Sequence, residues 1–215
     1  MLSNLDFGLA LHKSVLSGKY DRFRHNPADD EQQMIYVSPL SAVEDAIREV
    51  RPSHLVSLLD PETMIGTPEG ILPDRHLRIG INDIAEAIDD LVPPGTEHVS
   101  ALIDFVRGWD QRQPLLVHCW AGISRSTAAA FITLCALNEE HPEDELAQLV
   151  RSCGSHAHPN RLMVKLADEL LAREGRMSAA VEALGPGRAC WEGELFAIPL
   201  RPADDLSTAR FPRSR

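Results

Sequence analysis

The sequence is poor in cysteine, has no excess of cationic residues and contains no long apolar run. No two of its four cysteines form a Cys-x-x-Cys pair, which argues against a disulfide framework; they are Cys119, Cys135, Cys153 and Cys190. Lys and Arg number 21 against 32 Asp and Glu, and the formal net charge is −11. This charge argues against nucleic acid or an anionic membrane as a partner.

The apolar residues are also too interrupted for a membrane or secretory segment. No apolar run approaches the ~20 residues that a transmembrane helix needs. Near the N-terminus, Asp6, His12 and Lys13 break up the apolar residues, so the segment lacks the long apolar core of a signal peptide. We therefore expect no membrane partner.

Short apolar runs of strand length alternate with segments of helical spacing. The runs of strand length are 33–37, 54–59, 75–81 and 114–117, and the helical segments follow them along the chain. A capping box at Ser41 and Glu44 is expected to open the first helix. This alternation predicts an α/β fold with a mostly parallel central sheet of about four to five strands, flanked by helices.

The predicted domain organisation has three parts. Residues 1–33, in which 19–25 and 28–31 are polar and unpatterned, are expected to form an N-terminal extension. The domain is predicted to span 34–200, with its core at about 34–175, and 191–200 is expected to pack as an extended arm. Residues 201–215 are polar and are expected to be a flexible tail.

The most informative stretch is 117–126, Val-His-Cys-Trp-Ala-Gly-Ile-Ser-Arg-Ser, between a buried strand and an Ala-rich helix. Cys119 opens this loop, and the loop ends at a helix N-terminus, which favours anions. The guanidinium of Arg125 matches two oxygens of a phosphate at once. Gly122 permits a turn with positive φ, Ser126 can donate to the sulfur, and His118 is expected to support the loop's shape.

The nine residues 118–126 resemble the signature of the cysteine-dependent protein tyrosine phosphatases. The form His-Cys-x-Ala-Gly-x-Ser-Arg-Ser is most similar to the dual-specificity branch, in the manner of small bacterial members. The resemblance implies a protein tyrosine phosphatase-like fold and catalysis by Cys119, Arg125 and Ser126. It also implies a loop that binds substrate, or a phosphate or sulfate ion, through residues Trp120, Ala121, Gly122, Ile123, Ser124 and Arg125.

The resemblance further implies a general acid, and Asp83 is our candidate. Asp83 follows an apolar strand, as Cys119 does, and the carboxyl ends of parallel strands share one edge of a sheet. The alternatives are Asp89, Asp90 and Asp104, and Asp83 could instead cap the turn that follows it.

Two histidines and an asparagine follow the next helix. His156 and His158 lack the carboxylate or cysteine company of a metal site, so we expect no metal and no cofactor. Asn160 is expected to cap the helix that carries Leu162 and Leu166.

The resemblance therefore implies a phosphate monoester hydrolase that works through a cysteinyl-phosphate intermediate. Its substrate would be a phosphorylated protein or a small phosphomonoester, with phosphotyrosine favoured because no lysine or second arginine lies in the loop. A phosphoinositide or inositol phosphate phosphatase, a non-catalytic phosphopeptide-binding module and a sulfur-transferring persulfide loop are the alternatives. A catalytic thiolate needs a reducing compartment, so we expect a cytoplasmic protein.

Overall fold

One five-stranded sheet organises the residues that the computed structural model describes, 33–86 and 88–201. Its strand order is β3-β2-β4-β1-β5. The strands are β1 (Met34–Pro39), β2 (His54–Leu59), β3 (His76–Gly80), β4 (Leu115–Cys119) and β5 (Phe196–Pro199). The first four strands run parallel and β5 pairs antiparallel with β1. The predicted mostly parallel sheet of about four to five strands is confirmed.

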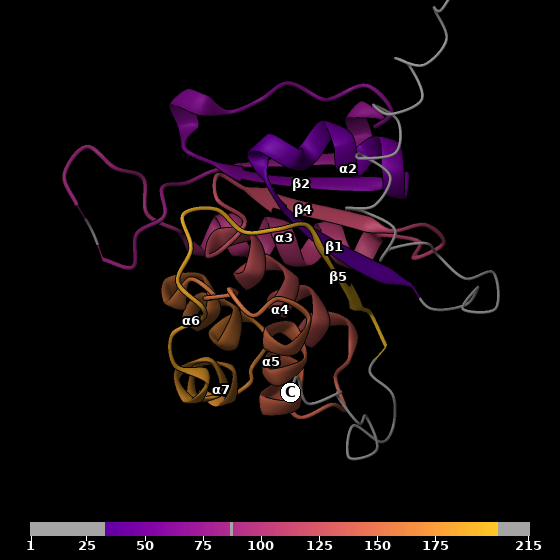
Figure 1. The fold of residues 1–215 in the computed structure, drawn as a ribbon. Coiled ribbons are helices and arrows are strands. Elements are labelled where there is room, and N and C mark those ends of the chain that lie inside the picture. The colour runs from indigo at the N-terminus through magenta and orange to yellow at the C-terminus, as the bar shows by residue number, and fades with distance from the viewer. Residues whose placement is uncertain (1–32, 87, 202–215) are drawn as a thin grey trace, which may run out of the picture. The chain divides into compact units, whose positions relative to one another are not determined.

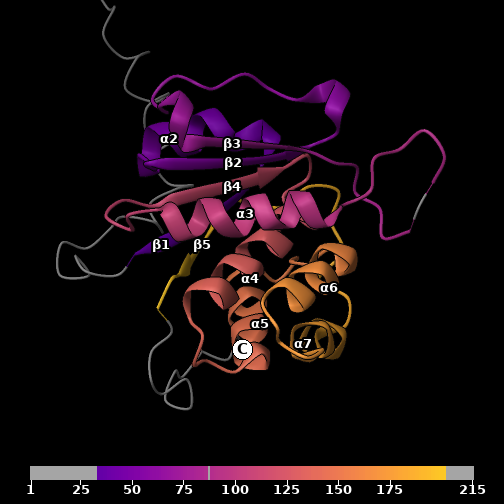
Figure 2. The same ribbon diagram turned by 180° about the vertical axis from the view of Figure 1, so that it is seen from behind.

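Helices cover both faces of this sheet (Figures 1 and 2). They are α2 (Val43–Val50), α3 (Thr96–Gly108), α4 (Arg125–Leu137), α5 (Glu143–Cys153), α6 (Arg161–Leu170) and α7 (Arg176–Leu184). Helix α2 lies on one face, and the views from both sides place α3 to α7 on the other. None of the described helices is long and apolar enough to span a membrane.

Alternate residues of the central strands enter two separate cores, because successive side chains of a strand point to opposite faces. Leu55 and Leu116 pack with Ile47 of α2 in the smaller core. Val117 joins Phe131 of α4 in the larger core. Strands β2 and β4 are buried on both faces, which explains why apolar residues predominate in their runs of the sequence.

The start of α2 differs from the expectation. The helix begins at Val43 after a short 3-10 turn, its N-cap is Ala42, and no side chain caps it. The Ser41 hydroxyl donates instead to the Glu192 carboxylate, at 2.6 Å. The capping box predicted at Ser41 is therefore wrong, because a partner 151 residues away takes its hydroxyl.

The chain between α7 and β5, residues 185–195, is the yellow segment that leads into β5 in Figure 1. We call it the strap. The predicted N-terminal extension, 1–33, and the predicted tail, 201–215, lie outside the described residues except for Gln33 and Arg201.

Candidate active site

The signature loop, residues 119–125, lies where the strands end. Strand β4 is the middle strand of the sheet, and its last residue is Cys119, which pairs with Pro39 of β1 and Leu58 of β2. Helix α4 begins at Arg125. The expected order of strand, tight loop and helix N-terminus is therefore present.

The carbonyl groups of the loop bond outward, to separate parts of the chain. The Trp120 carbonyl accepts from the Leu40 amide at 3.1 Å, and the Ala121 carbonyl from the Gly193 amide of the strap at 2.8 Å. The carbonyls of Ile123 and Ser124 accept from the amides of His158, at 2.9 Å, and Asn160, at 3.3 Å. These bonds fix the orientation of the peptide planes.

The amides of the same peptides remain available. Within the described part of the chain, no backbone N–H of residues 120–125 donates a hydrogen bond to a protein group. A row of free amides at the N-terminus of a helix is a ready site for an anion. The loop therefore has the electrostatic character that a bound phosphate needs.

Gly122 is required by this geometry. Its φ is +70°, in the left-handed region, and a Cβ at this position would lie 2.7 Å from the Pro39 amide nitrogen. Any other residue would be strained and would collide with the end of β1.

Cys119 and Ser126 lie together beneath the loop. The Cys119 sulfur is 3.1 Å from the Ser126 hydroxyl oxygen, and the two residues are 1% and 0% exposed. Ser126 belongs to the first turn of α4, so its position is set by the helix. It can donate to a thiolate, which favours the sulfur as nucleophile and as leaving group.

Arg125 is held at its outer end by two acceptors. One terminal nitrogen, Nη1, donates to the Asp60 carboxylate at 2.8 Å and to the Ile81 carbonyl at 2.7 Å. Its Nε atom is buried and has no partner among the described residues. The guanidinium is therefore fixed in place while its inner edge stays free for an oxyanion.

Asp83 faces the loop from the segment after β3. Its Oδ1 accepts from the Ser124 hydroxyl at 2.6 Å and from the Asn160 side-chain amide at 2.9 Å. Both bonds use Oδ1, so Oδ2 remains to carry a proton. The three alternatives, Asp89, Asp90 and Asp104, are exposed and do not line the pocket described next.

The loop borders a pocket of about 490 Å³. It is lined by Asp60, Thr63, Asn82, Asp83, Ile84, Leu91, Trp120, Ala121 and Arg125. Arg125 is the one cation among these described lining residues. Trp120, 56% exposed, and Leu91 give the pocket an apolar rim.

His118 does not face the pocket. It is completely buried, and its Nε2 lies 2.6 Å from the Ser57 hydroxyl oxygen. Burial lowers the pKa of His118 to about 4, so the ring is neutral at physiological pH. The structure thus places it under the loop, as a support.

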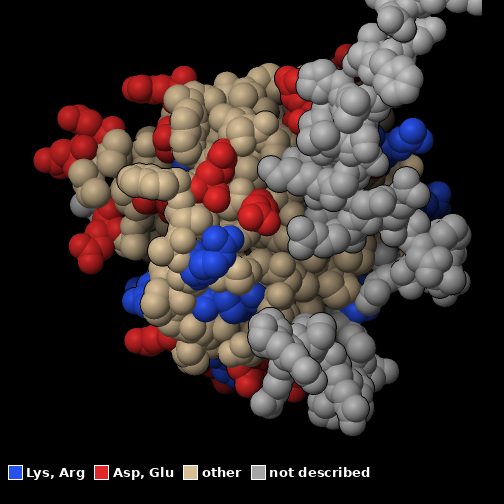
Figure 3. Space-filling view, in the orientation of Figure 1, with Lys and Arg blue, Asp and Glu red and all other residues tan. Residues whose placement is uncertain are grey.

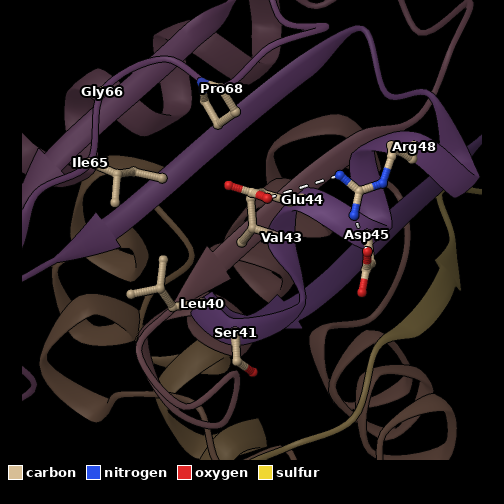
Figure 4. A pocket seen from close by; sticks show the side chains of 9 residues that line it. All are labelled: Leu40, Ser41, Val43, Glu44, Asp45, Arg48, Ile65, Gly66 and Pro68. Atoms are coloured by element: carbon tan, nitrogen blue, oxygen red, sulfur yellow. Dashed lines mark hydrogen bonds and ion pairs between the residues drawn. The ribbon is translucent and has the colours of Figure 1, made fainter.

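A second pocket of similar volume lies beside the start of α2 (Figure 4). It is lined by Leu40, Ser41, Val43, Glu44, Asp45, Arg48, Ile65, Gly66 and Pro68. Arg48 forms ion pairs with Glu44 and Asp45 across its wall. These described lining residues include no cysteine or histidine.

His156 and His158 do not form a metal site with other ligands in the described residues, where no cluster of three His, Cys, Asp or Glu is found. The amide of His158 supports the loop, and the ring of His156 packs edge-on against Phe196 at 5.3 Å. Asn160 caps α6 as predicted, since its side-chain oxygen accepts from the Met163 amide at 3.0 Å.

Sequence reasoning missed Asp60, the second contact of Asn160 and the strap. Asp60 directly follows β2, so the rule that selected Asp83, a polar residue after a buried parallel strand, could have found it. No local pattern predicts that Asn160 reaches Asp83 or that Gly193 reaches Ala121.

Comparisons with known proteins agree with this geometry. The protein-tyrosine phosphatase family model matches residues 88–161, which include the signature loop but not Asp83. No curated protein matches the chain.

Among solved structures, the human tyrosine phosphatase-like serine/threonine/tyrosine-interacting protein is similar at 18% identity and a TM-score of 0.52, over 65% of this chain and 92% of that one. DUSP15 is similar at 20% identity and a TM-score of 0.49, over 69% and 90%. The Cydia pomonella PTP-2 phosphatase is similar at 18% identity and a TM-score of 0.47, over 63% and 84%. The family-model match thus shows that residues 88–161 are similar to the protein-tyrosine phosphatase family, and the likeness to the first of these structures shows the fold.

Proposed function

We propose that this protein hydrolyses phosphate monoesters, with phosphotyrosine in proteins as the preferred substrate and phosphoserine or phosphothreonine as further substrates. One observation carries the proposal. Among the described residues, the amides of residues 120–125 donate to no protein group and the buried Nε of Arg125 has no partner, while the Cys119 sulfur of the same loop lies 3.1 Å from a hydroxyl donor. This is an anion site built around a nucleophile.

The proposed reaction has two steps. The Cys119 thiolate attacks phosphorus, an S–P bond forms, and the bond from phosphorus to the ester oxygen breaks. Asp83 gives its proton to the departing oxygen from Oδ2. In the second step Asp83 takes a proton from a water molecule that attacks phosphorus. The S–P bond then breaks, phosphate leaves, and Ser126 donates to the departing sulfur.

The rim of the pocket supports a single phosphate next to an apolar group. Trp120 and Leu91 can pack against an aromatic ring, and Arg125 is the one lining cation in the described residues. The chain has no Lys or Arg in 60–74, which follows β2, or in 81–95, which follows β3. A polyphosphorylated inositol would need more cations than this mouth supplies.

The acidic loop after β3 also bears on which residues would flank the phosphorylated residue of a substrate. Figure 3 shows acidic and uncharged side chains, and no basic ones, over the projecting loop after β3. This loop carries Glu86, Asp89 and Asp90. We propose that this loop disfavours phosphopeptides with acidic residues beside the phosphorylated residue and favours phosphopeptides with basic residues there.

The thiolate chemistry fits a reducing compartment, and the proposal includes a cytoplasmic location.

The test measures phosphate release, with EDTA present, from p-nitrophenyl phosphate, phosphotyrosine and phosphoserine peptides, and a short-chain phosphoinositide. Cys119→Ser should abolish turnover, and Asp83→Asn should lower kcat on phosphotyrosine by about 10²-fold. Asp104→Asn is the matched control, because Asp104 is an exposed acid on α3 outside the pocket. A preference for the phosphoinositide would refute the substrate. Tight phosphopeptide binding without turnover would refute the enzyme and support the binding-module alternative.

A further inference from the structure

The second pocket, beside the start of α2, is a neighbour of the candidate active site. Leu40 lines the second pocket, and its amide donates at 3.1 Å to the carbonyl of Trp120, which lines the active-site pocket. Thr63 lines the active-site pocket and Ile65 lines the second one, and two residues of chain span at most about 7 Å. A peptide bound at the active site can therefore reach the second pocket within a few residues.

Apolar side chains form much of the wall of the second pocket. Val43 is buried, whereas Leu40, Ile65 and Pro68 are only partly buried and keep some of their surface open. Figure 4 shows these side chains around a common space. The volume of the pocket, about 490 Å³, has room for a long side chain of a bound peptide.

One carboxylate at this pocket is left without a hydrogen bond. The guanidinium of Arg48 donates to Asp45 but stays 3.9 Å from Glu44. Within the described part of the chain, the Glu44 side chain accepts no hydrogen bond, and it is 84% exposed. Figure 4 shows the Glu44 carboxylate pointing into the pocket, toward the side of Ile65 and Pro68, and the Asp45 carboxylate pointing away from it. Glu44 is therefore free to accept from a cation that enters.

The charge around the pocket is negative. Two carboxylates and one guanidinium line it. The facing segment, 60–74, has no Lys or Arg and carries Glu62 and Glu69. On the rim, the Ser41 hydroxyl donates to the carboxylate of Glu192 at 2.6 Å. A cationic side chain is attracted to such a site, and an acidic one is repelled.

We propose that this pocket is a subsite for an arginine side chain of the phosphoprotein substrate, within four residues of the phosphotyrosine. The apolar stem of the arginine packs against Leu40, Ile65 and Pro68, and its guanidinium donates to both oxygens of Glu44. Lysine has a stem and a charge but no planar fork, so it binds more weakly. The phosphopeptide as substrate rests on the proposed function, whereas the affinity of the pocket for an arginine side chain does not.

The first test is a set of phosphotyrosine peptides in an alanine background, with one arginine moved through the four positions on each side. At one position, arginine should raise kcat/KM about fivefold over citrulline, which has the same shape without the charge, through a lower KM. Norleucine, which has only an apolar stem, should exceed alanine there. Glu44→Gln should remove the advantage of arginine over citrulline and retain that of norleucine over alanine.

Glu49→Gln is the matched control. Glu49 is an exposed carboxylate of the same helix that does not line the pocket, so its loss changes the net charge equally. The advantage of arginine should persist in this variant. The subsite would be overturned if no position favoured arginine, if every favoured position kept its advantage in Glu44→Gln, or if Glu49→Gln lowered the advantage as much as Glu44→Gln does.

A measurement without a phosphate ester separates the subsite from the proposed function. Nitrogen-15 spectra of the full chain are recorded with an unphosphorylated arginine peptide at millimolar concentration and with its citrulline analogue. Larger shifts from the arginine peptide at the amides of 40–45 and 65–67, reduced in Glu44→Gln, would support the subsite even if the protein hydrolysed no ester. Equal shifts from both peptides, or none at these amides, would overturn the subsite and leave any turnover of phosphotyrosine unaffected.

Discussion

Asn160 joins the proposed general acid to the helix that follows the loop, and its two roles can be separated by substitution. Its side-chain oxygen caps α6, and its side-chain nitrogen donates to Asp83 at 2.9 Å and to the Ile84 carbonyl at 3.3 Å. Serine retains a capping oxygen but is too short to reach Asp83, whereas alanine loses both functions.

The expected magnitudes follow from these bonds. Loss of the cap costs about 1 kcal/mol, or about 2–4 °C in melting temperature for a domain of this size. Asp83 is exposed, so the bond from Asn160 contributes only about 1 kcal/mol, which is about fivefold in kcat. Asn160→Ser should therefore lower kcat about fivefold with a smaller loss of melting temperature than Asn160→Ala, which loses the cap as well.

The assay compares phenyl phosphate with p-nitrophenyl phosphate, at equal enzyme concentration, and records melting temperature beside it. Phenol is the poorer leaving group and needs the acid more, so Asn160→Ser should lose more activity on phenyl phosphate. Asn160→Asp keeps the cap but places a carboxylate against Asp83. It should move the basic limb of the pH profile upward, because a like charge opposes ionisation of Asp83. An equal loss on both substrates, or none, would refute the positioning of Asp83 by Asn160.

Buried ionisable groups and one close backbone contact give three more expectations. Burial lowers the pKa of His76 and His118 from 6.5 to about 4. The contribution of these neutral histidines to folding stability should therefore be full above pH 6.5 and should decline as the pH falls toward 4. A melting temperature that stays constant between pH 6.5 and 4 would contradict this expectation. Glu143→Gln leaves the buried guanidinium of Arg173, at 3.2 Å, without its carboxylate. It should reduce the urea-derived free energy of unfolding by about 3 kcal/mol, and a loss under about 1 kcal/mol would count against a buried ion pair. Gly193→Ala would press a methyl group into the buried imidazole of His156 and should lower both melting temperature and activity. Gly108→Ala, which meets nothing within 4 Å, should lower neither.

The sheet could be predicted from the sequence because its signals are local. Segment 54–59 is mostly apolar and forms β2 with the predicted bounds. The strand predicted at 114–117 extends two residues further, to Cys119, because its hydrogen bonds continue along β1 and β2. The signature loop is also made of consecutive residues. Its place between a strand and a helix can therefore be predicted from the order of the segments along the sequence.

The contacts that hold the site could not be predicted in the same way. Arg125 meets Asp60 across 65 positions, and Asn160 meets Asp83 across 77. No periodicity encodes such pairs. For the same reason, the local pattern predicts a capping box at Ser41, but the Ser41 hydroxyl donates to the distant carboxylate of Glu192 instead.

These distant contacts decide whether a signature loop can bind an anion at all. A peptide that turns its N–H inward must turn its carbonyl outward, and a buried carbonyl without a partner costs about 1–3 kcal/mol. Here the outward carbonyls are met by four amides, those of Leu40, His158, Asn160 and Gly193, which lie in three separate segments. The nine-residue signature specifies the nucleophile and the turn, but the anion site depends on the rest of the fold. Variants of the strap should therefore weaken phosphate binding although they never touch the phosphate.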